Sequence, residues 1–160
     1  MQRGVAIIHD ASPGLVPRLA AKLKCLAGAA AVVIYAACLD TAVIFASLAE
    51  GACGCVAESA PPDQLRQAIS EAGRGRVFLC NLAEWEVRER LKELAAAAGS
   101  KPLTEKEAQV CLWLVGHQEK VLPFLLSLRT STVHTHVERV YAKLGAHSRE
   151  QFLGLLCRRR

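Results

Sequence analysis

The stretch that decides the fold runs from Leu103 to Gly145 and reads LTEKEAQVCLWLVGHQEKVLPFLLSLRTSTVHTHVERVYAKLG. Its last third has apolar residues at i, i+4, i+7, i+8 and i+11, the spacing of one face of an α-helix. These residues are Val133, Val137, Val140, Tyr141 and Leu144. The opposite face can donate or accept hydrogen bonds at nearly every position, and it carries Thr132, His134, Thr135, His136, Glu138, Arg139 and Lys143. Such a face suits the major groove of DNA.

The basic charge of the chain is confined to its C-terminal part. Residues 1–100 contain ten Lys and Arg against ten Asp and Glu, so their formal charge is zero. Residues 101–160 contain ten against five and therefore hold the whole net charge of +5. Because DNA is a dense polyanion, a basic segment beside a neutral one is typical of a DNA-binding domain attached to a control domain. Charge alone leaves a second interpretation open, a solvated basic surface without a partner.

Several classes of protein are not favoured by the composition. The longest uncharged run, residues 25–39, is too short to span a bilayer, and MQRGVAIIHD at the N-terminus lacks the apolar core of a signal peptide. We therefore expect a cytoplasmic protein with no membrane partner. The seven cysteines form no CxxC pair and stand mostly among apolar residues, which indicates reduced core residues and no metal site. With no nucleophile or phosphate-binding motif, we expect neither a cofactor nor enzymatic activity.

The N-terminal half alternates short apolar runs with amphipathic segments. Strands are predicted at residues 5–8, 32–35 and 53–57, and helices at 16–26, 40–49, 63–72 and 83–97. Residues 77–79 form a brief apolar tail that is not assigned to a strand. This alternation is typical of an α/β fold with a parallel sheet. The sequence thus predicts an α/β N-terminal part with a three-stranded parallel sheet, followed by an all-α part.

The segment from Leu103 to Gly145 resembles the LuxR-type helix-turn-helix domain. The marks of the resemblance are LT at the start with Glu107, then TVHTH, VYAKLG and SRE. It implies an all-α C-terminal domain of four helices, at residues 105–114, 119–127, 131–144 and 149–157. Two capping boxes are predicted, Thr104 with Glu107 and Ser148 with Gln151.

The resemblance implies that the helix at residues 131–144 reads the major groove of double-stranded DNA. His134, Thr135 and Glu138 occupy outward positions that reach base edges, and His134 replaces the lysine most common in the family. Arg129, Ser131, Thr132 and Lys143 lie where phosphate contacts are usual. His136 matches a histidine that steadies the helix or touches a phosphate, and Thr130 is expected to cap it. The predicted DNA-binding residues are Arg129, Thr130, Ser131, Thr132, His134, Thr135, His136, Glu138, Arg139 and Lys143.

The segment VVIYAACLDTAVIFASLAEGACGCVAESAPPDQLRQAISEAGRGRVFL, residues 32–79, resembles the fourth strand through the last helix of a response-regulator receiver domain. The shared pattern is an apolar strand, a helix ending in AEGACGC, a strand, then APPDQLRQAI and GRGRVFL. The sheet would then be a three-stranded remnant of a receiver fold. The domains implied are a truncated receiver-like domain at residues 1–82, a linker helix at 83–101 and the helix-turn-helix domain at 102–160.

The receiver resemblance places Asp10 at the phosphoacceptor position. Phosphoryl transfer to an aspartate needs a hydroxyl and a lysine near the phosphoryl oxygens. This chain has Ala36 where the family has Thr or Ser, and Glu58, which repels a phosphate, where the family has Lys. We therefore predict a degenerate site without phosphorylation or Mg²⁺. A second alignment, with His9 and Asp10 as the acidic pair of the first strand, stays open, although the SPG turn after Asp10 favours the first.

The sequence predicts a DNA-binding transcriptional regulator of the response-regulator type that acts without phosphorylation. The alternative is a dimerisation or interaction partner of a full-length response regulator that does not bind DNA. Pro123, which removes a hydrogen bond from the second helix, and Glu138, whose carboxylate repels phosphates, motivate this alternative. So do the missing strands, because they leave the strand at 5–8 as an open sheet edge. A homodimer, or a heterodimer with a related regulator, is expected, and the receiver resemblance implies that its surface is formed by the helix from Asp40, the strand at Cys55 and the helix from Asp63.

Overall fold

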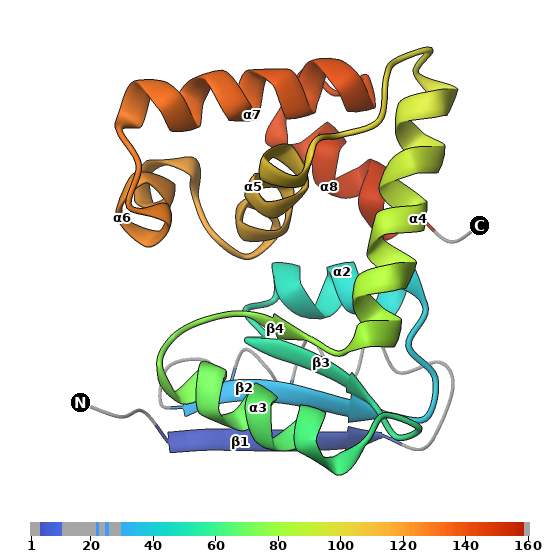
Figure 1. Cartoon of the computed structure of the whole chain (residues 1–160), viewed down its shortest axis with the longest axis vertical. Helices are drawn as coiled ribbons and strands as arrows, with labels where there is room; N and C mark the ends of the chain where they lie inside the picture. The colour runs from blue at the N-terminus through green and yellow to red at the C-terminus, as the bar shows by residue number, and fades with distance from the viewer. Residues whose placement is uncertain (1–3, 11–21, 23–24, 26–29, 159–160) are drawn as a thin grey trace. The chain divides into compact units, whose positions relative to one another are not determined.

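The structure is a computed structural model that describes residues 4–10, 22, 25 and 30–158 (Figure 1). The chain divides into two compact units, residues 1–87 and 88–160. The first unit contains β1 Gly4–Asp10, β2 Ala30–Ala36, α2 Thr41–Ala49, β3 Gly54–Ala57, α3 Pro62–Gly73, β4 Phe78–Leu79 and the start of α4 Asn81–Ala97. The predicted helix at 16–26 lies outside the described residues, apart from Lys22 and Cys25.

The described strands of the first unit form a parallel sheet in the order β1-β2-β3-β4. The sheet has four strands, so the prediction of three is wrong. The additional strand is the apolar tail after α3, where the Phe78 N–H donates to the Cys53 carbonyl at 2.9 Å and the Cys80 N–H donates to Cys55 at 3.0 Å. A two-residue strand is too short to show an alternating pattern of apolar residues. The strand is therefore recognised by its backbone hydrogen bonds and not by sequence periodicity.

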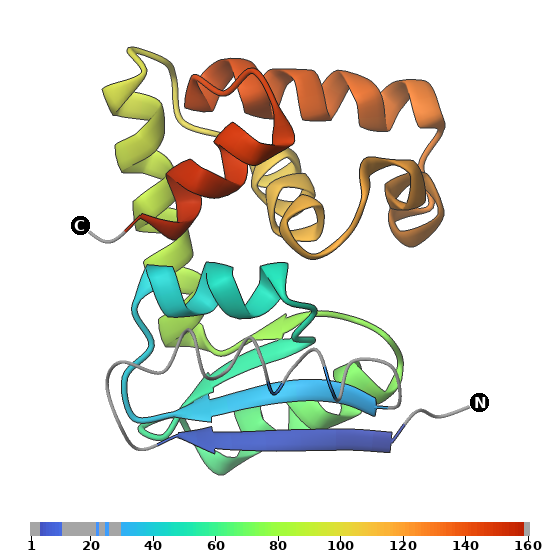
Figure 2. The ribbon, with the colours of Figure 1, turned by 180° about the vertical axis from the view of Figure 1, so that it is seen from behind.

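The core of the first unit lies between the sheet and its helices. Val32, Val33 and Ile34 of β2 and Val56 of β3 are completely buried, as expected for central strands of a parallel sheet. Helix α3 contacts all four strands and crosses one face of the sheet, in front of it in Figure 1 and behind it in Figure 2. Helix α2 packs against β3, and its first turn is capped by the Asp40 carboxylate, which accepts from the Val43 N–H at 2.8 Å.

The second unit is helical. It contains the rest of α4, α5 Glu105–Gly116, the 3₁₀ turn η1 Glu119–Val121, α6 Leu122–Leu126, α7 Thr130–Leu144 and α8 Arg149–Cys157. Helices α5, α6 and α8 all lie on one side of α7 in both ribbon views (Figures 1 and 2). The buried residues of α7 are Val133, Val137, Val140 and Leu144, which confirms four of the five residues of the predicted apolar face. The fifth, Tyr141, is half-buried, with its ring centroid 5.5 Å from that of Phe152.

The predicted second helix of this unit, residues 119–127, is not continuous. It is split into η1 and the short α6, in which Pro123 occupies one of the first two positions. A proline is tolerated there because the first N–H groups of a helix have no partner within it, whereas further along it would remove a hydrogen bond. The 3₁₀ turn therefore allows the chain to accept Pro123 and still bury Leu122 completely.

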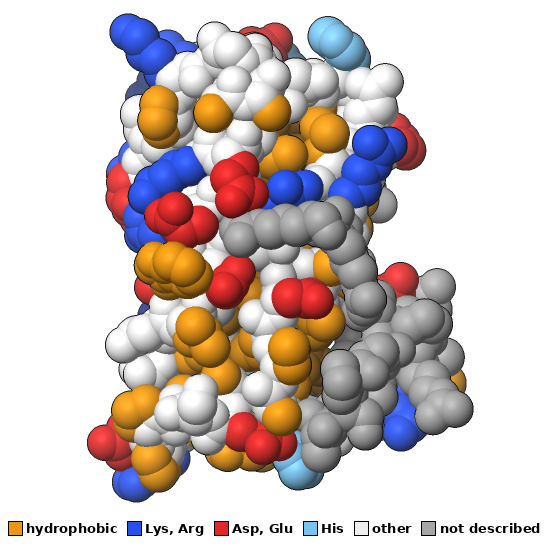
Figure 3. All heavy atoms as spheres, turned by 90° about the vertical axis from the view of Figure 1, so that its right-hand side faces the viewer, with side chains coloured by type: hydrophobic (Ala, Val, Ile, Leu, Met, Phe, Trp, Pro, Cys, Tyr) orange, Lys and Arg blue, Asp and Glu red, His pale blue; other side chains and the backbone are white. Residues whose placement is uncertain are grey.

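Large apolar side chains are exposed on both units. Hydrophobic side chains are visible on the side of the N-terminal unit that Figure 3 presents (orange). The exposed large hydrophobic residues are Ile7, Leu82, Trp85, Val121, Phe124 and Leu128. In the described ranges, no helix combines the length and the apolar character needed to cross a membrane.

Candidate nucleic-acid interface

The side of α7 opposite its buried residues is polar and open to solvent. Figures 1 and 2 show no helix over this side within the unit. The exposed polar residues from Arg129 to Leu144 are Arg129, Thr130, Ser131, Thr132, His134, Thr135, Glu138 and Arg139. They include eight of the ten residues predicted to contact DNA. The same helix thus fixes one face in the core and presents the other as a continuous polar surface.

The turn before α7 sets where this surface begins. Ser127 ends α6 in the left-handed conformation with φ 53°, and its N–H donates to the Phe124 carbonyl. Arg129 is the N-cap of α7 and makes no side-chain capping bond, so the prediction that Thr130 caps the helix is wrong. Thr130 is the first helical residue, because Arg129 already has the extended backbone of an N-cap. The Arg129 side chain therefore accepts no hydrogen bond from the N–H groups in the first turn of α7.

His134 bridges two carboxylates at the exposed surface. Its Nδ1 lies 3.0 Å from Glu119 Oε1 of η1, and its Nε2 lies 3.2 Å from Glu138 Oε1, one turn later in α7. The hydrogen bond with Glu119 and the negative charge of Glu138 raise the pKa of His134 above its ordinary value. The three side chains form a set that we call the acid–imidazole bridge. It ties the segment before α6 to the predicted reading helix.

Thr135 and Lys143 have hydrogen-bond partners within the domain, whereas the buried Nδ1 of His136 has none among the described residues. The Thr135 hydroxyl donates to the Ser131 carbonyl at 3.0 Å, and the residue is exposed. The Lys143 ammonium lies 2.7 Å from Glu107 Oε2 and donates to the Pro102 carbonyl at 3.1 Å. The half-buried His136 ring lines a groove between α5 and α6 together with Trp113 and other residues. Lys143 and His136 thus contact the scaffold, and the side chains named above face solvent.

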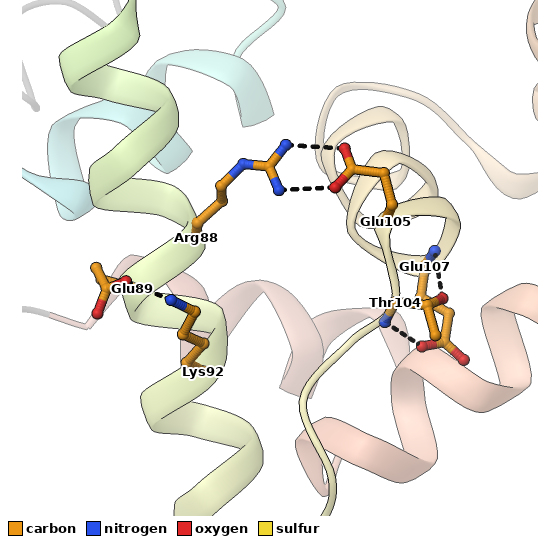
Figure 4. Close-up of polar contacts among 6 residues, drawn as sticks. All are labelled: Arg88, Glu89, Lys92, Thr104, Glu105 and Glu107. Carbon is orange, nitrogen blue, oxygen red and sulfur yellow. Dashed lines mark hydrogen bonds and ion pairs between the residues drawn. The ribbon is translucent and has the colours of Figure 1, made fainter.

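Glu107 anchors the start of α5. The predicted capping box is confirmed: the Thr104 N–H donates to Glu107 Oε2 at 2.7 Å and the Glu107 N–H donates to the Thr104 hydroxyl (Figure 4). Burial of the Glu107 carboxyl opposes its ionisation, but the hydrogen bonds from Lys143 and Thr104 outweigh this effect and lower its pKa. A buried carboxylate therefore joins α5 to the C-terminal turn of α7.

Arg149 secures the other end of α5, and the sequence reasoning missed this role. Its guanidinium donates to the carbonyls of Leu114, His117 and Val115 at 2.7, 2.6 and 3.3 Å. A cation suits these carbonyls because the last C=O groups of a helix have no partner within it. The predicted second capping box is only half formed. Ser148 accepts from the Gln151 N–H, but the Gln151 amide oxygen accepts from the His147 N–H instead of that of Ser148.

The second half of α4 is also tied to this unit by arginines. Arg88 makes a bidentate pair with Glu105 in the first turn of α5, at 2.7 and 2.8 Å (Figure 4). Arg90, whose side chain is only 13% exposed, donates to the carbonyls of Leu155 and Arg158 at the end of α8. These contacts fix α5 and α8 beneath α7 and so help to define the surface it presents.

The predicted degenerate phosphorylation site falls at the carboxyl end of the sheet in the first unit. Asp10 ends β1 opposite Ala36 of β2, and the Glu58 N–H donates to the Ala36 carbonyl at 2.9 Å. Glu58 Oε1 lies 2.5 Å from Nε2 of His9. The edge therefore pairs a carboxylate with an imidazole. In the part of the chain that the structure describes, no group of three His, Cys, Asp or Glu side chains is placed to hold a metal ion.

Comparison with known proteins identifies the helical domain. Residues 101–155 match the family model described as bacterial regulatory proteins, luxR family. The glycerol metabolism activator of Pseudomonas putida is 28% identical over 127 residues, 75% of this chain. The chain spans 58% of the length of that curated relative.

Solved structures similar to this chain include a response regulator, RcsB of Salmonella typhimurium, at 20% identity and a TM-score of 0.47, covering 98% of this chain and 76% of RcsB. Another is ChrA, the response regulator of a heme-sensing two-component system, at 24% identity and a TM-score of 0.39, covering 94% of this chain and 73% of ChrA. At these TM-scores neither similarity bears on function. The family match concerns the segment that carries the exposed face of α7, so residues 101–155 form a helix-turn-helix domain of the luxR family.

Proposed function

We propose that this protein is a DNA-binding transcriptional regulator that reads the major groove with the exposed face of α7. The luxR-family match of residues 101–155 supports the class of protein. The observation that carries the proposal is the division of α7 into a buried apolar face and an exposed polar face. A helix of this kind can enter the major groove without unfolding any of its packing.

The exposed side chains divide into two proposed groups. His134, Thr135 and Glu138 contact base edges: the Thr135 methyl group suits the methyl group of thymine, and the Glu138 carboxylate can accept from the amine of cytosine. Arg129, Arg139 and the hydroxyl groups of the first turn contact phosphates, aided by the N–H groups at the start of the helix. Because its ammonium binds Glu107 and Pro102, we assign Lys143 to holding α7 in position, and because its ring lines the groove between α5 and α6, we give His136 the same role.

A salt titration of duplex binding tests this function. Fluorescence anisotropy of the full chain with a labelled random-sequence duplex should show affinity that falls steeply with salt, because phosphate contacts release counterions. Arg129→Ala should reduce the slope of log affinity against log salt by about 0.9 if one phosphate contact is lost. Arg66→Ala is the matched control, since Arg66 is exposed on α3 in the other unit. Absence of duplex binding at low salt would exclude the proposed function as a DNA-binding regulator.

We also propose that the regulator acts without phosphorylation of Asp10. Ala36 has no hydroxyl group and Glu58 adds a negative charge at the same edge of the sheet, so a phosphoryl group there would meet repulsion. Incubation with acetyl phosphate and Mg²⁺, followed by phosphate-affinity electrophoresis, should leave the protein unshifted. A shifted band that Asp10→Asn removes would contradict the proposal.

A second function, as an interaction partner of a full-length response regulator, is favoured by the edge of the sheet. Strand β1 pairs with β2 on one side and lies at the edge of the described sheet, and Ile7 on it is 46% exposed. Such an edge is a template for another chain. Light scattering after size exclusion separates a homodimer from a monomer. Co-purification with an intact receiver protein, without duplex binding by this chain alone, would select this second function.

A further inference from the structure

The acid–imidazole bridge lies on the surface that we propose for DNA. The side chains of Glu119, His134 and Glu138 are 42%, 62% and 65% exposed, so all three are accessible to a duplex on α7. Both ring nitrogens of His134 face a carboxylate. A protonated imidazole can donate at both nitrogens, whereas a neutral one can donate at only one. The geometry of the bridge is therefore complete only in the protonated form.

The charge of the bridge changes with the state of its imidazole. With neutral His134, the two carboxylates give the bridge a charge of −2, and protonation reduces this to −1. Negative charge on a groove-facing surface repels the phosphates on either side of the groove. When His134 loses its proton, one contact that restrains a carboxylate is also lost. Both effects oppose binding of a polyanion at higher pH.

Glu119 and Glu138 are the carboxylates in contact with the His134 imidazole, and the charged groups on the elements packed against α7 are as follows. Helix α6 carries no titratable side chain, and η1 supplies Glu119 and Lys120. In α5, the two carboxylates already bind Arg88 and Lys143. In α8, the Arg149 guanidinium binds the carbonyls that end α5. The remaining titratable and charged groups on α5, α7 and α8 are Lys106, Cys111, His136, Arg139, Tyr141, Glu150 and Cys157, and the Nδ1 of His136 is buried on the side of α7 that faces the groove between α5 and α6.

We propose that the acid–imidazole bridge makes DNA binding by this protein pH-dependent, with affinity increasing as the pH falls and His134 becomes protonated. Glu119, which lies outside the reading helix, acts as a positioning residue that holds the ring against Glu138. This inference rests on the proposed function. It sets the chain apart from relatives with the more common lysine at this position, because a lysine keeps its charge across the same range.

Anisotropy with the full chain and a labelled random-sequence duplex of about 30 base pairs, roughly three helical turns, tests the inference. At constant ionic strength, binding at about pH 6 should be about fivefold tighter than at about pH 8, the effect of one unit charge a few ångströms from a phosphate. His134→Gln should abolish this difference. His134→Lys should bind tightly at both pH values, and His147→Gln, at an exposed histidine between α7 and α8, should retain the wild-type response.

Proton NMR titration of the His134 ring supplies a readout without DNA. Glu119→Gln should move its midpoint to lower pH, because the main contact that favours the protonated ring is lost. Equal affinity at both pH values, or a wild-type response in His134→Gln, would overturn the inference and leave the proposed function intact. If the duplex binds at neither pH, the proposed function fails and the inference fails with it.

Discussion

The two units of the chain use charged side chains in different ways. In the C-terminal unit, buried or half-buried charges connect the helices: Glu107 binds Lys143, and Arg149 binds the end of α5. In the N-terminal unit, the described fully buried polar residues are the uncharged Thr41 and Ser47, and the half-buried Glu71 pairs with Arg74 and Arg76 just after the end of its own helix α3, so this pairing does not connect two helices. Charged networks demand correct geometry, since a buried charge without its partner is costly. The difference implies that the C-terminal unit is built to hold one surface fixed, and the N-terminal unit only to pack.

Among the tests of this comparison, the largest loss of stability is expected for the substitution Glu107→Ala. The substitution removes half of the capping box and leaves Lys143 without its carboxylate, so the C-terminal unit should lose about 3 kcal/mol of unfolding free energy. Urea unfolding followed by Trp113 fluorescence, in a Trp85→Phe background, reports on α5 in this unit. Glu107→Gln keeps the reach to Thr104 and should cost less. Equal stability of Glu107→Ala and wild type would mean that the ion pair does not hold the unit.

The pH dependence of the same residue gives an independent check. Because the pKa of Glu107 is lowered on folding, its contribution is present above the pKa of the unfolded chain and is lost as the pH falls through the folded value. The C-terminal unit should therefore lose stability below about pH 4, the ordinary range of a glutamate. Glu107→Gln should flatten this loss. An unchanged acid profile in that variant would assign the loss to other carboxylates.

In the N-terminal unit the sharpest test is Gly54→Ala. A methyl group at this position would lie 3.0 Å from the Phe78 carbonyl oxygen and would press β3 away from β4. The expected cost is about 2 kcal/mol, the usual range for overpacking. The Phe78 N–H donates to Cys53, just before β3, and the Cys80 N–H donates to Cys55 of β3; hydrogen exchange of both groups should accelerate. Gly4→Ala is the control, since nothing lies within 4 Å of its added methyl group. Equal exchange in both variants would question the fourth strand.

A smaller effect on stability is expected at the two residues of the C-terminal unit that end a helix with a left-handed backbone conformation. Ser127 ends α6 with φ 53° and Gly145 ends α7 with φ 69°. A side chain in this region costs about 1 kcal/mol, so Ser127→Gly should stabilise the unit by about that amount and Gly145→Ala should destabilise it similarly. Urea midpoints with Trp113 fluorescence measure both. Stabilisation by Gly145→Ala would show that the backbone conformation does not limit this unit.

The local features of the fold could be predicted from the sequence, whereas the contacts between distant residues could not. The spacing of Val133 and Val137, and the bounds of α8, were readable because a helix repeats every few residues. The fourth strand, β4, could not be predicted, since it has two residues and its partner Gly54 lies far away in the chain. The roles of Arg149 and Glu119 depend on residues that only folding brings together. For the same reason Pro123 signalled a disturbance of the second helix but not the 3₁₀ turn that accommodates it.

The smallest expected effect separates ion pairs by their exposure. Arg88 and Glu105 form a bidentate pair with good geometry, and the hydrogen bond from Arg88 lowers the pKa of Glu105. The Glu105 side chain is 73% exposed, so water screens the pair and its partners lose side-chain freedom in forming it. Glu105→Gln should therefore shift the urea midpoint by only a small fraction of the shift caused by Glu107→Ala, and high salt should remove that remainder. If the two variants shift it equally, then burial of the carboxylate is not what makes the Glu107 network rigid, and the contrast between the units rests on the number of ion pairs alone.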